Sequence, residues 1–255
     1  MYLCGLKGIE IINHKYLRKM KKQARFLMII AMMICSVCAF AQKPFAGNIT
    51  FEMSAEGSND PNLTAQLAEQ SVEYIVMGNN SRMEVSQGID VITIANGNNK
   101  TYTIILGIPG YGKYYIQQTE EDLQKRLTTA KYDYKYTEDT KTISGYNCKK
   151  VIMTITDLET DESETSVLWV TEELGLGDDI NFYERPGLKG YPLSMETQKE
   201  INGENLTLIQ TATKIVPNKK VKSTQFLLPS DAKPFEEAPE ELKQMLGGMG
   251  GDDDE

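Results

Sequence analysis

Residues 71–106 read SVEYIVMGNNSRMEVSQGIDVITIANGNNKTYTIIL. Apolar and polar side chains alternate along this stretch, for example over Val72, Tyr74 and Val76, which is the period of a β-strand with one buried face. Gly- and Asn-rich breaks divide it into four segments, and the last break contains Asn96-Gly97, a strong hairpin signal between two strands. The stretch therefore predicts a meander of four antiparallel strands.

The same alternation continues on both sides of the meander. Further strands are expected over residues 47–54, 113–118, 133–141, 148–157, 164–171, 191–201, 205–216 and 223–228. The chain thus carries about eleven strands, and their short connections favour antiparallel pairing. Because a sheet of this size must curl, split or close, we expect a mainly β fold with one large curved antiparallel sheet that forms an open half-barrel.

Two or three short helices are expected to cover the concave face of this sheet. The candidates are Asp60–Gln70, a helix that follows Thr119, and Pro239–Leu246. Thr119 and Asp122 have the spacing of a capping box, in which each side chain bonds the other's backbone amide. An apolar cleft between the sheet and these helices follows from this arrangement.

The N-terminal segment has the order of a secretory signal peptide. Residues 27–41 read LMIIAMMICSVCAFA, follow a cluster of basic residues, and end in an A-x-A processing site. The apolar run is shorter than the roughly 20 residues that cross a membrane comfortably. We expect residues 1–41 to be a signal peptide with its start at Met20 and cleavage after Ala41, so that the product does not span a membrane.

The expected destination is the periplasm or the medium. A lipoprotein signal needs a small residue before the acylated Cys, whereas Ile34 precedes Cys35 and Val37 precedes Cys38. We therefore expect no lipid anchor. The rest of the chain is read as a β half-barrel domain over residues 42–235, followed by a short helix and a flexible acidic Gly/Asp tail over residues 236–255.

The charge of the exported part excludes one class of partner. The first 41 residues hold seven Lys or Arg and one Glu, so the remaining chain has a net charge of −15, against −9 for the whole. An acidic surface repels phosphate backbones, and nucleic acid is not expected as a partner.

Few chemistries remain for the exported chain. Three of the four Cys and the only His, His14, lie in the first 41 residues. Without His there is no Ser-His-Asp relay and no zinc site of His or paired Cys. We expect no catalytic residue, no metal site, no cofactor and no enzymatic activity, with an enzyme that works through Asp or Glu alone as a distant third hypothesis.

One segment resembles a phosphate-binding loop. Residues 107–113 read GIPGYGK and fit G-x-x-x-x-G-K, but Tyr114 stands where a magnesium-binding Ser or Thr is needed, and a strand follows instead of a helix. A Gly-Pro hairpin loop is the better interpretation.

Several large apolar side chains fall on the expected inner faces of the strands. They are Phe51, Met53, Tyr74, Met83, Tyr102, Met153, Trp169 and Met195. Aromatic and Met side chains of this kind form either a packed core or the adaptable lining of a site for a lipid-like ligand. The residues chosen as candidate ligand contacts are Phe51, Tyr74, Met83, Tyr102, Trp169 and Met195.

Four segments resemble a known family in their order. They are Thr142–Lys150 (TISGYNCKK), Val167–Gly175 (VLWVTEELG), Gly190–Glu196 (GYPLSME) and Phe226–Pro229 (FLLP). This order resembles domain-of-unknown-function family 4412 of secreted bacterial proteins, over roughly residues 47–235. The family is similar in layout to LolA-type lipoprotein carriers, which implies a half-barrel with helices across its mouth, able to hold something apolar.

Two functions are compatible with these observations. The first is a non-enzymatic periplasmic or secreted binding module that holds a lipid, acyl chain or apolar peptide between the sheet and the helices. The alternative is a structural or protein-interaction factor of the cell envelope with a filled core, whose partner contacts a sheet edge or the acidic tail.

Overall fold

The computed structural model describes residues 45–57, 71–86, 88–201 and 204–247, and twelve strands in these ranges form a single sheet. The strands are β1 (Ala46–Glu56), β2 (Ser71–Met77), β3 (Asn80–Ser86), β4 (Asp90–Asn96), β5 (Thr101–Ile108), β6 (Gly112–Gln118), β7 (Ala130–Ile143), β8 (Tyr146–Asp157), β9 (Ser163–Thr171), β10 (Tyr191–Ile201), β11 (Glu204–Pro217) and β12 (Ala232–Pro234). The same ranges hold α3 (Glu120–Thr129), α4 (Glu240–Gly247) and the short 3₁₀ turns η2 (Asp178–Asn181), η3 (Ser223–Phe226) and η4 (Phe235–Glu237).

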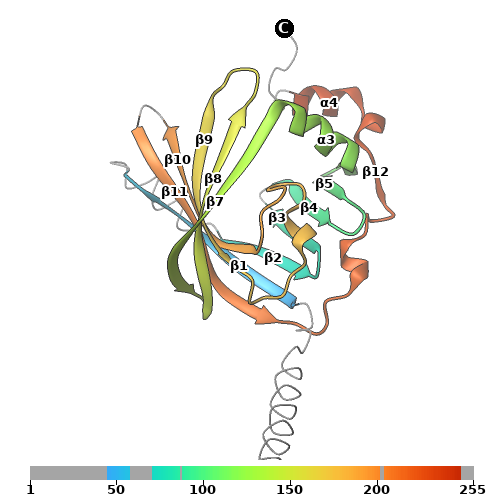
Figure 1. Cartoon of the computed structure of the whole chain (residues 1–255). Coiled ribbons are helices and arrows are strands. Elements are labelled where there is room, and N and C mark those ends of the chain that lie inside the picture. Colours follow the sequence, from blue (N-terminus) through green and yellow to red (C-terminus); the bar gives the residue numbers. More distant parts are fainter. Residues whose placement is uncertain (1–44, 58–70, 87, 202–203, 248–255) are drawn as a thin grey trace, which may run out of the picture. The chain divides into compact units, whose positions relative to one another are not determined.

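The sheet is curved and does not close (Figure 1). Its strand order is β12-β6-β5-β4-β3-β2-β1-β11-β10-β9-β8-β7. All neighbours pair antiparallel except β12, which runs parallel to β6. The central pairing of β1 with β11 joins the meander β2–β6 to the second group of strands, β7–β11. The expected mainly β fold with an open, curved antiparallel sheet is confirmed.

Cross-strand pairs show which side chains share a face. Ile49 of β1 lies opposite Tyr74 of β2, and Tyr74 lies opposite Met83 of β3. Met53 of β1 and Met195 of β10 both lie opposite Gln210 of β11. Since directly opposed residues point to the same side of a sheet, these side chains lie on one face, called here the inner face.

The outer face of the meander is covered by the chain that follows β11. Phe226 and Val221 pack there against Ile92, Ile94 and Ile105 of β4 and β5. We expected a strand near residues 223–228, and this was wrong, because the segment packs on the sheet instead of pairing with it and forms η3.

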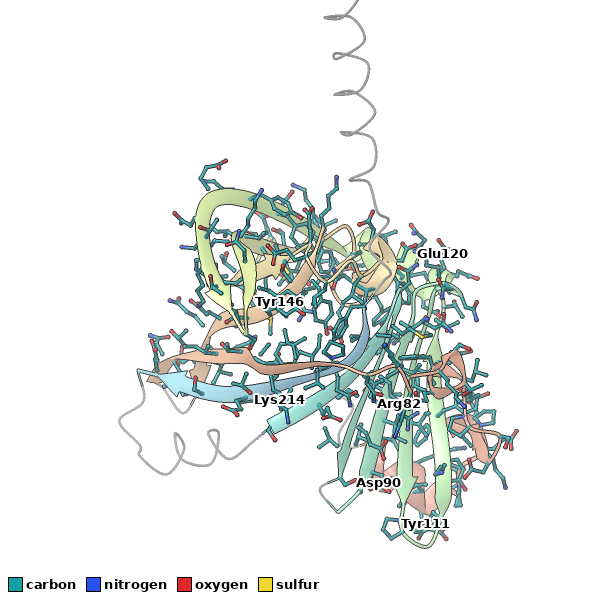
Figure 2. All side chains as sticks on the ribbon, turned by 90° about the horizontal axis from the view of Figure 1, so that it is seen from below. Arg82, Asp90, Tyr111, Glu120, Tyr146 and Lys214 are labelled. Atoms are coloured by element: carbon teal, nitrogen blue, oxygen red, sulfur yellow. The ribbon has the colours of Figure 1, made fainter. Side chains whose placement is uncertain are left out.

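The two helices pack at opposite ends of the inner face of the meander. Leu123 of α3 contacts Ala95, whereas Leu242 of α4 is buried against Ile108 and Tyr114. Figure 2 shows Glu120, where α3 begins, at one end of the strands and Tyr111, in the β5–β6 turn, at the other. The predicted helices after Thr119 and within residues 239–246 are confirmed.

Local sequence determines how α3 begins. Thr119 accepts a hydrogen bond from the Asp122 amide, and the Asp122 carboxylate accepts one from the Thr119 amide at 2.8 Å, which is the predicted capping box. The Thr119 amide and the Thr119 hydroxyl both donate to the Asp122 carboxylate at 2.8 Å, and these two bonds hold the pKa of Asp122 below its usual value.

Three expectations fall outside the described residues. They are the signal peptide over residues 1–41, the helix at Asp60–Gln70 and the acidic end of the tail at residues 248–255. Among the helices that the structure does describe, none is long and apolar enough to cross a membrane.

Candidate functional site

The connection between β9 and β10, residues 172–190, lies within the curve of the sheet (Figure 1). Its apolar side chains are anchored in two core clusters. Ile180 is buried beside Phe51 on the inner face, and Phe182 is buried beside Leu123 of α3. The connection therefore covers the inner face together with the helices.

Aromatic and cationic contacts hold the middle of this connection. The rings of Tyr183 and Tyr102 stack with their centroids 4.2 Å apart and their planes 15° apart. The guanidinium carbon of Arg126, on α3, lies 4.2 Å from the Tyr183 centroid, and the Arg126 guanidinium also donates to the Tyr183 carbonyl oxygen. Such contacts add to the apolar burial that holds the connection in place.

Of the three spaces described here between the sheet and the segments that cover it, the most enclosed is small. It has a volume of about 40 Å³, and Phe51, Tyr74, Tyr191 and Met195 are among the residues around it. This is room for about one water molecule. The centre of the inner face is thus filled by the protein's own side chains.

A larger groove opens beside this filled centre, over strands β8–β11 and β1. Its volume is about 350 Å³, which lies in the range of small-molecule sites. The apolar residues that line it are Met53, Met153, Ile155, Met195 and Leu208, and the polar ones are Glu164, Ser166, Glu184, Arg185, Thr197, Lys199 and Gln210. We call this space the inner groove.

The polar residues of the inner groove lie in two groups. Lys199 and Glu164 form an ion pair of 2.6 Å between β10 and β9. Glu184 and Arg185 come from the β9–β10 connection and pair at 2.7 Å, and the other terminal nitrogen of Arg185 lies 3.5 Å from the sulfur of Met195. The groove therefore joins an apolar floor to a largely buried guanidinium.

A second groove of about 360 Å³ lies between α3 and the same connection. Leu123, Leu127 and Phe182 contribute apolar surface, and Lys100 and Asp179 form an ion pair at its side. Polar and charged groups, such as Glu120, Asp178 and Lys189, make up much of the rest of its lining. It is less suited than the inner groove to an apolar ligand.

The six residues predicted to contact a ligand do not line one common site. Phe51 and Tyr74 pack edge to face, with centroids 5.4 Å apart, beside the small cavity. Met195 alone of the six candidates lines the inner groove. Tyr102 lies under Tyr183, and Met83 lies on the inner face opposite Tyr74 but lines neither the small cavity nor the two grooves described above.

Trp169 does not lie on the face that we expected. We expected it on the inner face, but its neighbour Leu168 lies opposite Met195 and Val151 on that face, so Trp169 points to the outer one. There the indole N–H donates to Glu196 at 3.1 Å, and the Lys141 ammonium lies 4.6 Å from the ring centroid. An indole has a polar edge and an electron-rich face, and both are satisfied on the outer side.

The alternation of side chains along the strands identifies part of the inner groove but not all of it. Met53 and Met153 were placed on the inner face by their alternation, and both line the groove. Ile155 and Leu208 have the same alternation but were not singled out. Arg185 could not have been found from a strand pattern, because it lies in the irregular connection between β9 and β10.

Two other features that could carry chemistry, the Cys148 thiol and the G-x-x-x-x-G-K segment, are structural. Cys148 is buried, and its burial raises the pKa of the thiol to about 11. Gly107 and Lys113 pair across the β5–β6 hairpin, so the G-x-x-x-x-G-K segment forms a β-turn and not a strand-to-helix phosphate loop. In the described ranges no group of three or more His, Cys, Asp or Glu is placed to hold a metal.

Comparisons with known proteins bear on the fold. A family profile described as "Domain of unknown function (DUF4412)" matches residues 45–185. No curated protein matches the chain. Among solved structures, PNGF-II in the P21 space group has a TM-score of 0.50 at 17% identity, and PNGF-II in the C2 space group has 0.51 at 16%. Each match covers 80% of this chain and 33% of the other, so the chain spans about a third of these structures, and the likeness is one of fold alone.

Proposed function

The chain belongs to the family described as domain of unknown function (DUF4412), whose profile covers more than half of it, and on this premise we propose that the protein is a non-enzymatic binding module for an apolar or lipid-like ligand. The observation that carries the proposal is the inner groove. Its floor is formed by three Met side chains with Ile155 and Leu208, and it opens beside a core that is already filled.

The composition of this floor suits a flexible chain. Met side chains are unbranched and polarizable, so they adapt to ligands of different shape. Removing apolar surface from water contributes about 25 cal/mol per Å², or about 0.8 kcal/mol for each buried methylene group. An acyl chain of several carbons in the groove would therefore gain several kcal/mol without any catalytic group.

We also propose that the module works outside the cytoplasm. The order of basic residues, apolar run and A-x-A site before Gln42 supports export, and the bulky residues before Cys35 and Cys38 support a product without a lipid anchor. N-terminal sequencing of the protein recovered from the periplasm and the medium should give Gln42 as the first residue. Recovery of a longer, membrane-bound chain would contradict this.

Adjacent residues of β11 provide a matched test of the groove. Leu208 lines it, whereas Ile209 points to the other face of the same strand. A Leu208→Glu substitution should abolish binding of the neutral fluorescent probe N-phenyl-1-naphthylamine and should remove co-purified lipid from native mass spectra. Ile209→Glu should leave both unchanged. Equal binding by the two variants would contradict the proposal.

The envelope-factor alternative rests on one observation, the free edge of the sheet. β7 is 14 residues long and forms one end of the strand order. Its edge is protected, however, because β7 carries Lys131, Lys135 and Lys141 and its pairing with β8 is irregular between Tyr136 and Thr140. These features oppose addition of another strand, and we therefore rank this function second.

A truncation of the C-terminal tail can distinguish the two functions, provided that α4 is retained. Leu242 and Ala238 are buried against β5 and β6, so removal of residues 236–255 would expose that core. Removal of residues 248–255 leaves α4 in place. Loss of a cross-linked envelope partner with unchanged lipid content would favour the alternative, and an unchanged partner profile would exclude the tail as the contact and leave only the β7 edge for it.

A further inference from the structure

Three buried hydrogen-bond donors near the inner groove have no acceptor among the described residues. They are the Nε atoms of Arg126 and Arg185 and the hydroxyl group of Tyr134. Buried donors are nearly always paired, because leaving one without an acceptor costs its full desolvation. A ligand that brings acceptor atoms would remove this cost.

The three groups belong to one neighbourhood. Tyr134 packs in the core cluster that contains Met195 and Leu188, and a Cβ added at Gly187 would lie 4.0 Å from its ring. Arg185 contacts the sulfur of the same Met195. The Arg126 guanidinium carbon lies 5.7 Å from the ring of Tyr132, two residues before Tyr134 on the same face of β7.

Arg185 has one edge available for a new acceptor. One terminal nitrogen pairs with Glu184, while the other meets only the Met195 sulfur, which is a weak acceptor. The edge formed by this second nitrogen and Nε presents two parallel N–H groups, the geometry that a carboxylate accepts bidentately. The side chain is 16% exposed, so a bond made there is shielded from water.

Arg185 supplies the positive group that a carboxylate would meet in the inner groove. Arg126 has Asp122 one helical turn before it, Arg185 pairs with Glu184, and Lys199 pairs with Glu164, so the unpaired donors and not the net charge select the ligand. Tyr134 stays neutral, because burial raises its pKa.

We propose that the inner groove binds a straight-chain fatty acid, with its carboxylate on the free edge of Arg185 and the Tyr134 hydroxyl and its alkyl tail over Met53, Met153 and Met195. This inference rests on the proposed function and adds to it the charge of the ligand and the direction in which it lies. The carboxylate end points toward the β9–β10 connection, and the tail extends along the floor formed by β8–β11.

The inference can be tested by titration calorimetry of the purified protein. Four ligands are compared that have the same alkyl tail and differ only in the head group. Dodecanoate should bind at least about tenfold more tightly than dodecanol, since a hydrogen bond to a charged group contributes at least that factor. Dodecylamine should bind more weakly than dodecanol. Dodecyl phosphate should bind no more tightly than dodecanoate. Tighter binding of dodecyl phosphate would overturn the assignment of a carboxylate to this site.

Two variants locate the carboxylate. Arg185→Gln should lower the affinity for dodecanoate about tenfold and leave the affinity for dodecanol unchanged. Tyr134→Phe removes only an unpaired hydroxyl, so it should fold normally and weaken dodecanoate alone, which keeps the test open if Arg185→Gln is unstable. An equal effect of both variants on dodecanoate and dodecanol, or no effect on either, would overturn the inference while the groove remained a binding site. Failure of the unaltered protein to bind dodecanol or dodecanoate would overturn the proposed function itself.

Discussion

Tyr102 of β5 and Tyr183 of the β9–β10 connection stack face to face, with ring centroids 4.2 Å apart. These residues are 81 positions apart in the sequence, and their contact joins the two groups of strands across the concave face. The Arg126 guanidinium lies on the Tyr183 ring as well, 4.2 Å from its centroid. The position of Arg185, two residues later, therefore depends on an aromatic contact with the opposite half of the sheet.

Replacing Tyr183 with Ala should loosen the connection. The change removes the ring that stacks on Tyr102 and contacts Arg126, and we expect a loss of about 2 kcal/mol in the free energy of unfolding, from urea titration. Tyr111→Ala is the matched control, because Tyr111 is 45% exposed in the β5–β6 turn and should change stability by no more than about 0.5 kcal/mol. Equal losses in the two variants would show that the stack does not fix the connection.

Two glycines allow the connection to approach the meander. A Cβ at Gly177 would overlap the side-chain amide of Asn79, and a Cβ at Gly97 would overlap the backbone oxygens of Asp179 and Asn79. We expect both Ala substitutions to destabilise the protein by about 1–3 kcal/mol. The two positions should respond differently to a second change, Asn79→Ala.

A double-mutant cycle measures that difference. Asn79→Ala removes the atoms that obstruct a Cβ at Gly177 but not the backbone oxygens that obstruct one at Gly97. The loss in the free energy of unfolding caused by Gly177→Ala should therefore be smaller in the Asn79→Ala background. The loss caused by Gly97→Ala should be the same in both backgrounds. Identical coupling for the two pairs, measured by urea unfolding, would refute the steric explanation.

The strands could be predicted from the sequence because their signal is local. Side chains that alternate over SVEYIVM or VITIA report one buried face, and Asn96-Gly97 reports a turn, with no need to know what the face packs against. The capping box at Thr119 is local in the same way. These parts of the fold agree with the structure.

The position of the groove depends on contacts that no local pattern contains. Residues 172–190 have no alternation, yet they fill the centre of the inner face and bring Arg185 to the floor. Trp169 was misplaced because VLWVT is apolar on both sides of the strand, so alternation could not choose its face. In a strand buried on both faces, periodicity gives the strand but not its orientation.

Cys148 should be unreactive in the native protein. Burial raises the pKa of its thiol to about 11, so at neutral pH almost none of it is the nucleophilic thiolate. Peptide mapping after a short exposure to iodoacetamide at neutral pH should show Cys148 unmodified, and the same treatment in urea should modify it fully. Rapid modification of Cys148 in the folded protein would contradict its burial.

The protein should lose stability at alkaline pH through its tyrosines. Burial, with a further contribution from Glu184, raises the pKa of Tyr74 to about 12, against about 10 in an unfolded chain. The neutral phenol is the form favoured by folding, so this contribution is fully present below about pH 10 and is lost as the pH rises through about 12. Urea unfolding across this interval should show a steep fall that is about 2 kcal/mol smaller in Tyr74→Phe. If the free energy of unfolding fell equally with pH in the unaltered protein and in Tyr74→Phe, Tyr74 would not be the source of the loss.

Trp169 offers an optical test of the position of the ligand. It is the only Trp in the chain, and its ring lies on the outer face, held by Glu196 and Lys141. A ligand in the inner groove lies on the other side of β9, so saturation with dodecanoate should leave the wavelength of maximum Trp emission unchanged, and Trp169→Phe should change the affinity by less than about twofold. Glu196→Gln alters the polar partner of the indole and should shift the emission without changing the affinity. A ligand-dependent shift that disappears in Leu208→Glu would instead place the bound chain close to Trp169 and would contradict the assignment of the groove to the opposite face.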